Sequence, residues 1–276
     1  MIRWRCSNHL AALALGCLST LVTGCSTAQD LGGALVAPQK PVQAQVAQGF
    51  RHQITSEQPA RLMVIGDSLS QGFAQALQQR AAERKLALTV ANRGRVSTGL
   101  ARTDFHDWPI DFAVLAAAEQ PDIVVAHFGA NDMQGVTRPD NRAAYGTPEW
   151  DLAYRAEARR ILTTAAENGA VFMWLGPAPD GNSGLGKHMK YIAPLFKLEA
   201  EASGAIYLPL ADFTADADGN FATAIAINGV STTIRTGDGS HFNLTGYRLV
   251  ADHILDELLR RYPVLEPSAD MIATLQ

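Results

Sequence analysis

A short apolar run that ends in Gly-Asp-Ser constrains the fold more than any other part of this sequence. Residues 62–65 are Leu-Met-Val-Ile, which predicts a buried strand, and Gly66-Asp67-Ser68 follows at once. From residue 71 to residue 84 the apolar side chains recur at helical spacing. A serine between a strand and a helix lies on a tight turn, with its backbone N–H at a helix N-terminus that favours negative charge. Ser68 is therefore a candidate nucleophile; the alternative is that Ser68 or Ser70 only caps the helix.

The rest of the chain alternates in the same way between apolar runs and amphipathic segments. This alternation predicts an α/β fold, a three-layer, doubly wound parallel sheet of about five strands with a site at their carboxyl ends. The apolar fraction of 47% is ample for such a core. The expected strands are 62–65, 86–91, 122–128, 170–175 and 205–208, and the expected helices are 71–84, 109–119, 148–167, 188–203 and 245–261.

The first 24 residues have the pattern of an export signal. Two arginines precede a short apolar run, and Val22-Thr23-Gly24-Cys25 resembles the lipobox of bacterial lipoproteins. That resemblance implies a lipoprotein signal peptide over 1–24 and lipidation of Cys25. Because a serine follows the cysteine, it also implies an outer-membrane anchor that faces the protein into the periplasm. The alternatives are an ordinary signal peptide and an uncleaved anchor.

The chain after the signal divides into a tether, one domain and a tail. Residues 25–58 show no sustained periodicity and contain several prolines, glycines and glutamines, so a flexible tether is expected. A single domain is expected over 59–265, followed by a C-terminal tail at 266–276. Within the domain, residues 214–240 interrupt the alternation, and two apolar segments there flank Asn228-Gly229, which predicts an inserted β-hairpin.

Composition argues against several kinds of partner and cofactor. The net charge is -4 and no basic cluster stands out, so nucleic acid is not an expected partner. Signal cleavage would remove Cys6 and Cys17 and leave Cys25 acylated, so no thiol would remain for a disulfide, a metal or catalysis. No spacing of histidine, cysteine and carboxylate indicates a catalytic metal, and no cofactor is expected. The acidic segment at 216–219 is interpreted as a turn, because acids are missing where a calcium loop needs them.

Asp238-Gly239-Ser240-His241 offers a base for the candidate nucleophile. A serine hydroxyl is a poor nucleophile at neutral pH and needs such a base. Aspartate and histidine three residues apart, in a turn before a helix, can lie side by side. The histidine would then take the Ser68 proton while the carboxylate holds the tautomer of the ring. The alternative is a simple Asp-Gly turn with His241 on the surface.

Two loops that follow strands offer donors for an oxyanion. Gly129-Ala130-Asn131-Asp132 comes directly after the strand at 122–128, so the amide of Asn131 is expected at the same sheet edge as Ser68. The loop after the second strand contains Gly99, and a glycine lets a backbone N–H approach a substrate closely. Gly99 is preferred to Gly94 because it lies further into the loop. Four elements thus point to one rim of the sheet.

Other residues near this rim are candidates for weaker roles. His106 and Asp107 could form a rival base pair but are interpreted as structural or substrate-lining, and His127 is interpreted as a core histidine. The candidates for contact with substrate fall in the expected rim loops or beside the motifs: Asp67, Trp108, Asp132, Arg138, Arg142 and Arg235.

Together these motifs resemble the SGNH (GDSL-type) hydrolase superfamily, whose marker residues Ser, Gly, Asn and His stand in four blocks. The blocks here are 66–70, Gly99, 129–132 and 238–241, and the resemblance covers about residues 60–262. The segments at 97–100, 107–109, 129–134 and 174–177 further resemble a bacterial envelope branch. That branch is known mostly as a domain of unknown function and is related to the SGNH modules of polysaccharide O-acetylation systems.

The resemblance implies Ser68 as nucleophile, His241 as base and Asp238 as its orienter. The backbone N–H groups of Ser68 and Gly99 and the amide of Asn131 would form the oxyanion hole. The implied function is a serine esterase or O-acetyltransferase that acts through an acyl-enzyme on O-acyl, mainly acetyl, groups of cell-envelope or exported polysaccharide.

The implied partners follow from that function. The substrate would be an acylated glycan or a small ester, lipidated Cys25 would contact the membrane, and a membrane-bound acyltransferase would be a partner protein. Two alternatives stay open: a lipolytic esterase or thioesterase with the same triad, and a catalytically silent glycan-binding module.

Overall fold

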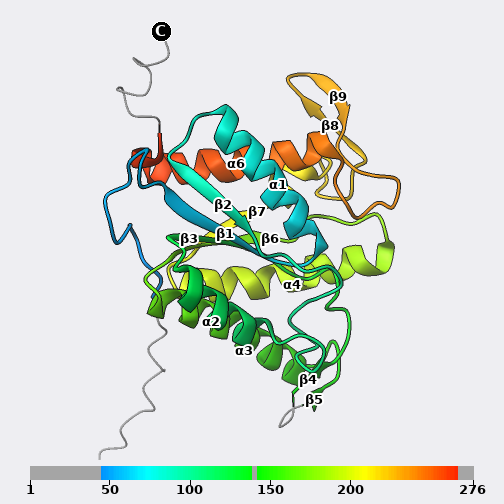
Figure 1. The fold of residues 1–276 in the computed structure, drawn as a ribbon. Helices are drawn as coiled ribbons and strands as arrows, with labels where there is room; N and C mark the ends of the chain where they lie inside the picture. The colour runs from blue at the N-terminus through cyan, green and yellow to red at the C-terminus, as the bar shows by residue number, and fades with distance from the viewer. Residues whose placement is uncertain (1–44, 139–141, 267–276) are drawn as a thin grey trace, which may run out of the picture. The chain divides into compact units, whose positions relative to one another are not determined.

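The central sheet has five parallel strands in the order β2-β1-β3-β6-β7, which confirms the predicted fold class (Figure 1). The computed structural model describes residues 45–138 and 142–266, all within a compact unit that begins at Val42. The strands of the sheet are β1 (Ala60–Gly66), β2 (Leu88–Asn92), β3 (Ile123–His127), β6 (Val171–Gly176) and β7 (Ile206–Pro209).

Helices cover both faces of the sheet and make the fold three-layered (Figure 1). One face carries α1 (Ser68–Glu83) and α6 (Leu244–Arg261), and the other carries α2 (Trp108–Glu119), α3 (Pro148–Glu167) and α4 (Ser183–Ala202). The short helix α5 (Ala211–Thr214) follows β7, and a single 3₁₀ turn, η1 (Pro263–Leu265), follows α6.

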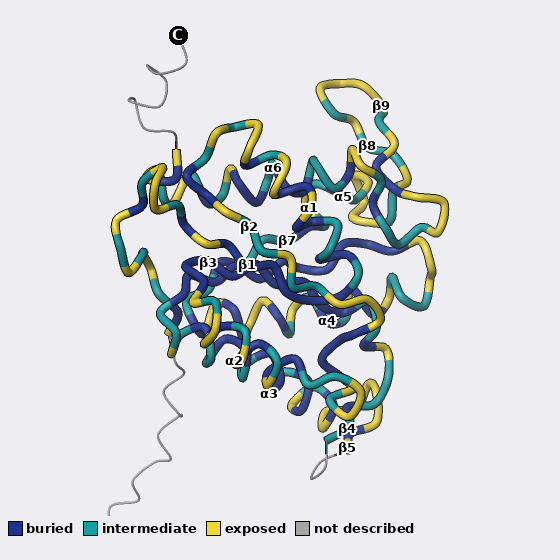
Figure 2. The backbone as a smooth tube through the Cα atoms, viewed as in Figure 1, coloured by how far each residue is buried: buried dark blue, intermediate teal, exposed yellow. Residues whose placement is uncertain are grey.

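The side chains of β1 alternate between two hydrophobic cores. Leu62 and Val64 pack with α1 and α6, whereas Met63 and Ile65 pack with α2, α3 and α4. Successive side chains of a strand point to opposite faces, so a strand covered on both sides is apolar at every position. Figure 2 shows the central strands β1, β3 and β6 largely buried between helices whose outer faces are exposed, whereas the edge strands β2 and β7 are only partly buried. This is why an uninterrupted apolar run marks the central strand.

Side-chain caps set where the helices begin. Asp67 accepts a hydrogen bond from the Leu69 N–H at 3.0 Å, and Thr147 accepts one from the Trp150 N–H at 3.2 Å. Such caps satisfy backbone donors that have no partner within the helix. As a result α1 begins at Ser68, before the predicted start at residue 71, and the Ser68 N–H lies in the first turn.

Helix α4 also begins earlier than the sequence pattern predicts. Residues up to 187 were expected to form a loop, since glycines weaken helices. Asn182 nevertheless caps α4 by accepting hydrogen bonds from the N–H groups of Gly184 and Leu185. Gly186 packs closely there, because a Cβ on it would lie 2.8 Å from the Asp180 carbonyl oxygen. Capping and close packing therefore override the low helix propensity of glycine.

The end of the predicted tether is also corrected by the structure. Within residues 45–58, Val46 and Ile54 are buried in the two cores, and the Val46 N–H donates to the Ser203 carbonyl at 3.0 Å. The guanidinium of Arg51 bonds to carbonyls of the loops after α2 and α3. Irregular segments of this kind carry no periodic pattern, so the sequence does not reveal that they are packed.

Two small antiparallel pairs lie outside the main sheet. The pair β8 (Ala224–Ile227) and β9 (Val230–Thr233) is a hairpin within the expected insertion. Its turn residues Asn228 and Gly229 have φ of 52° and 79°, as a type I′ turn requires. The second pair, β4 (Val136–Thr137) and β5 (Arg142–Ala143), lies between β3 and α3.

The expected signal peptide, Cys25 and all but the first residue of the expected C-terminal tail lie outside the described residues. Among the residues that the structure describes, no helix has the length and apolar character needed to cross a bilayer.

Candidate active site

The candidate site lies at the carboxyl ends of β1 and β3, where the strand order reverses. β2 lies on one side of β1 and β3 on the other, an arrangement that opens a crevice between the loops. Gly66 ends β1 with a φ of 129°. A Cβ on Gly66 would lie only 1.8 Å from the His127 carbonyl oxygen, so glycine is needed for the two strand ends to approach. The turn of Ser68 and the loop of Asn131 thereby leave neighbouring strands.

Ser68, His241 and Asp238 form a continuous hydrogen-bonded chain. The Ser68 Oγ lies 3.0 Å from His241 Nε2, and His241 Nδ1 lies 2.7 Å from Asp238 Oδ2. A base within hydrogen-bond reach of a hydroxyl, itself held by a third group, is the arrangement that activates a serine. The three residues come from the start of α1 and from the loop between β9 and α6, far apart in sequence.

The carboxylate of Asp238 is held ionised by its neighbours. The hydroxyl of Thr236 and the ring of His241 hold the pKa of Asp238 well below its usual range. Its Oδ1 also accepts the N–H groups of Ser240 and His241, so the carboxylate has one orientation. Thr236 was not predicted from the sequence. The order Thr-Gly-Asp is the available signal, because threonine and aspartate readily make local hydrogen bonds.

Arg235 supports this loop from behind instead of contacting substrate as predicted. Its side chain is buried, with the guanidinium 3.8 Å from the centroid of the Phe242 ring. The guanidinium donates to the carbonyls of Ser240 and Pro179, each at 2.8 Å. Burial lowers the pKa of Arg235 to about 10. Arg235 therefore ties the Asp238–His241 loop to the segment before α4.

The amide of Asn131 lies in the loop after β3, as expected, and is held in place by a backbone contact. Its Nδ2 donates to the Thr98 carbonyl at 2.8 Å, which joins the loops after β2 and β3. Gly99 is buried behind this contact, and a Cβ on it would lie 2.1 Å from Asp132 Oδ1. Gly94 lies against α1 instead, where a Cβ would meet the Ser70 hydroxyl. Only Gly99 is therefore joined to the Asn131 loop.

Three residues predicted to contact substrate are buried in the structure. Asp67 and Asp132 are fully buried: Asp67 caps α1, and Asp132 accepts the Ala101 N–H at 2.9 Å and the Tyr154 hydroxyl at 2.7 Å. Trp108 is also fully buried, at the start of α2, and its indole N–H donates to the Thr98 hydroxyl. These polar groups sit next to the motifs because they brace the loops, which sequence proximity alone does not distinguish from substrate contact.

The other histidines and arginines singled out in the sequence differ in their positions. His127 is buried in β3, as interpreted from the sequence, and its Nδ1 lies 3.1 Å from Asp67 Oδ1. His106 pairs with Asp111 at 3.3 Å and not with Asp107, which caps α2. Of the two predicted rim arginines, Arg138 forms ion pairs with Glu157 and Asp107, and Arg142 is exposed in β5.

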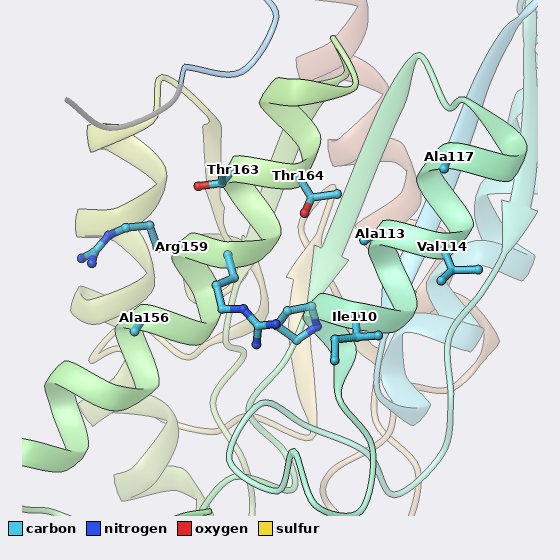
Figure 3. A pocket seen from close by; sticks show the side chains of 10 residues that line it. Ile110, Ala113, Val114, Ala117, Ala156, Arg159, Thr163 and Thr164 are labelled. Carbon is cyan, nitrogen blue, oxygen red and sulfur yellow. The ribbon is translucent and has the colours of Figure 1, made fainter. Parts of the chain in front are cut away.

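Two open hollows differ sharply in their relation to the triad. The larger, of about 770 Å³, lies between α2 and α3, and its apolar lining includes Ile110 and Val114 (Figure 3). Neither Ser68 nor any residue of the Asp238–His241 loop lines it. A second hollow, of about 500 Å³, is lined by Asn131, Asp238 and Ser240. Of these two hollows, only the smaller is lined by residues of the candidate site, so it is the candidate place for a substrate group.

Among residues 45–138 and 142–266, no group of three or more histidine, cysteine, aspartate or glutamate side chains is arranged to hold a metal ion.

Comparison with solved structures defines the class of this fold. A GDSL-like lipase from Bacteroides thetaiotaomicron is 14% identical, with 76% of this chain and 92% of that chain covered and a TM-score of 0.52. A carbohydrate acetylesterase family member from Sinorhizobium meliloti is 15% identical, with coverage of 73% and 98% and a TM-score of 0.52. TesA is 18% identical, with coverage of 73% and 99% and the same TM-score. The chain has the fold of the SGNH (GDSL-type) hydrolases.

A family model narrows this class further. The family described as "Protein of unknown function (DUF459)" matches residues 61–257, and the chain belongs to that family. The comparison with curated proteins gave no match. The match begins at β1 and ends within α6, so it includes every loop of the candidate site.

Proposed function

We propose that this protein is a serine esterase or O-acetyltransferase that acts on O-acyl, mainly acetyl, groups of cell-envelope or exported polysaccharide. The observation that carries the proposal is the hydrogen-bonded chain from Ser68 Oγ through the His241 ring to Asp238. It is supported by the position of Asn131 in the neighbouring loop, as an oxyanion donor requires.

The reaction would proceed in two steps through an acyl-enzyme. Ser68 Oγ attacks the ester carbonyl while its proton passes to His241 Nε2, and the carbonyl oxygen takes up negative charge facing the Asn131 amide and the N–H groups of Ser68 and Gly99. Collapse expels the alcohol, which receives that proton from His241. Water or a second sugar hydroxyl then attacks the acyl carbon and gives its proton to His241. Cleavage of the bond between that carbon and Ser68 Oγ releases the serine, which takes this proton back from His241. Asp238 orients the ring throughout.

Openness of the triad favours a polymeric substrate over a lipid one. The side chains of His241 and Asp238 are 40% and 52% exposed, so an ester carried on a bulky chain can reach the serine. One protein with a similar fold is described as a carbohydrate acetylesterase family member, which agrees with the proposal of a glycan-borne ester as substrate.

Release of acetate from glycans tests the proposal. The full chain would be incubated with O-acetylated xylan and with O-acetylated bacterial exopolysaccharide, with and without unacetylated acceptor, and acetate release or transfer followed. Acetyl esters should be turned over faster than dodecanoyl esters, and Ser68→Ala should be inactive. Turnover of dodecanoyl esters alone would favour a lipolytic enzyme. Glycan binding without any turnover or phosphonate labelling would favour a silent binding module.

We also propose that lipidation of Cys25 anchors the protein in the cell envelope, facing the periplasm, where a membrane-bound acyltransferase could supply acyl groups. The lipobox resemblance supports this placement. Mass spectrometry of the mature N-terminus should find an acylated Cys25, and Cys25→Ala should release the protein from membranes. An unmodified N-terminus elsewhere would contradict the anchor.

A further inference from the structure

The hollow beside the triad is built from three loops that belong to the site. The loop after β3 contributes Met133 and Gln134, the start of α4 contributes Asn182 and Leu185, and the loop before α6 contributes Asp238 and Ser240. Its volume of about 500 Å³ falls in the range of small-molecule sites. The hollow therefore has room for a ligand group beside Asn131 and Asp238.

The position of this hollow indicates which half of an ester enters it. The alcohol half must lie where His241 can return a proton to it, while the carbonyl oxygen faces the Asn131 amide. Asn131 lines the hollow from the loop after β3, and Asp238 and Ser240, which precede His241 in its loop, line it from the segment before α6. An alcohol expelled from the acyl carbon, or an acceptor approaching that carbon, therefore extends into this hollow.

The side chains of the wall combine fixed amides with an apolar platform. Asn182 Oδ1 accepts the N–H groups of Gly184 and Leu185 at 3.0 and 3.1 Å, which fixes the orientation of the amide. Its Nδ2 has no hydrogen-bond partner among the residues that the structure describes, so both N–H groups are available. Met133 is 48% exposed, and its methyl group lies near Gly184. A sugar ring offers what such a wall binds: hydroxyl groups and an apolar face of C–H groups.

Charge in the hollow selects among sugars. Asp238 is ionised, and none of the side chains that line the hollow is basic. A uronate would meet a carboxylate with no cation to compensate, and like charges at close range repel. The hollow is therefore suited to a neutral sugar.

We infer that this hollow is a subsite for a neutral sugar residue, with Met133 as its apolar platform and the Asn182 amide as a donor to a sugar hydroxyl. The inference rests on the proposed function, which it deepens by naming the substrate class at the alcohol side. Met133 lies in the segment at 129–134 that resembles the envelope branch, and no motif singles out Asn182 in the sequence.

Binding to an inactive full chain tests the subsite separately from catalysis. Ser68→Ala protein labelled with ¹³C in its methionine methyl groups would be titrated with xylotetraose, cellotetraose and a tetramannuronate and followed by NMR. The signal of Met133 would be assigned as the one that is lost in Met133→Ala. The neutral probes should shift that signal and bind at least tenfold tighter than the uronate, about the effect of 1.4 kcal/mol.

Two variants and a matched control sharpen this test. Asn182→Asp keeps the cap of α4 but removes the donor and adds a negative charge, so it should weaken neutral binding about fivefold to tenfold, as should Met133→Ala. Phe105→Ala removes another exposed apolar side chain, one that lines a different hollow, and should leave binding unchanged.

The outcomes separate the subsite from the proposed function. In one case the wild type releases acetate while the neutral tetrasaccharides leave the Met133 signal unshifted, and in another they bind equally well to Asn182→Asp. Either result would overturn the subsite and leave the proposed function standing. Binding at Met133 by a wild type that turns over no ester would keep the subsite and overturn the function. Uronate binding as tight as neutral binding, or no binding of either neutral probe, would also overturn the inference.

Discussion

Two aspartate–histidine pairs in this protein use the same side chains for different ends. In Asp238–His241 the carboxylate lies 2.7 Å from the ring, and in Asp67–His127 it lies 3.1 Å away. The first pair is 52% and 40% exposed, and the second is completely buried. His241 Nε2 faces Ser68, whereas His127 Nε2 has no polar partner among the described residues and its ring packs on Phe73.

The difference shows that what lies beyond the ring decides the role of such a pair. His241 has a hydroxyl and solvent on its far side, so it can exchange protons with a substrate. The buried pair has neither, and Asp67 instead accepts the N–H groups of Leu69 at 3.0 Å and Ala130 at 3.4 Å. It thus joins the turn of the nucleophile to the loop of Asn131. In the proposed function the exposed pair performs the chemistry, whereas the buried pair joins the two loops.

The largest effects should come from the exposed pair and its serine. We expect Ser68→Ala and His241→Ala each to lower kcat/KM by about 10⁴-fold or more, since the members of a triad act as a unit. Thermal unfolding should be nearly unchanged, because both residues lie at the rim. Ester hydrolysis and circular dichroism would check both points; retained turnover in either variant would contradict the assignment.

Asp238→Asn should cost less than His241→Ala. An amide keeps part of the geometry but no longer stabilises the imidazolium, so a loss of about 10³–10⁴ in kcat/KM is expected. The measurement is the same hydrolysis assay with the three variants side by side. A loss larger than that of His241→Ala would show that Asp238 does more than orient the ring.

His127→Phe should reverse the pattern seen for the exposed pair. Removing one partner of a buried pair leaves the Asp67 carboxylate buried without its ring, which we expect to lower the free energy of unfolding by about 3 kcal/mol. The pH profile of kcat/KM should keep its shape, because His127 does not exchange protons with substrate. Urea denaturation tests the first point and rate measurements across pH the second. A stable variant with a shifted profile would break the comparison.

A third histidine, His188, should make the stability of the fold depend on pH. Burial lowers the pKa of His188 to about 4, and its ring bonds to the Gly129 carbonyl and the Tyr145 hydroxyl. An unfolded chain takes up this proton near pH 6.5 and the folded chain only near pH 4, so stability present at neutral pH is lost as the pH falls between these values. The melting temperature should fall over that range, less steeply in His188→Gln. If the melting temperature falls equally steeply with pH in the wild type and in His188→Gln, the loss of stability does not come from His188.

His106→Gln should have the smallest effect. His106 pairs with Asp111 and packs on Trp108, away from the Ser68–His241 contact. Its replacement should change kcat/KM by less than about fivefold, or about 1 kcal/mol. A loss comparable to that of His241→Ala would revive the rival base pair.

Much of the fold follows from local sequence patterns, and the site follows in part. The apolar run at 62–65 marks the central strand because both of its faces are covered, and the blocks around Ser68, Asn131 and His241 indicate loops at one edge of the sheet. Burial could not be foreseen for Asp67, Trp108 and Asp132, because whether a polar side chain next to a motif faces solvent depends on distant elements that pack over it.

Trapping of the nucleophile tests the central claim most directly. The full chain would be treated with a fluorophosphonate and its peptides analysed by mass spectrometry, in the wild type, Ser68→Ala and His241→Ala. We expect one adduct, on the peptide that contains Ser68, absent from the first variant and formed far more slowly in the second. An adduct on another residue, or labelling at the wild-type rate without His241, would contradict the account.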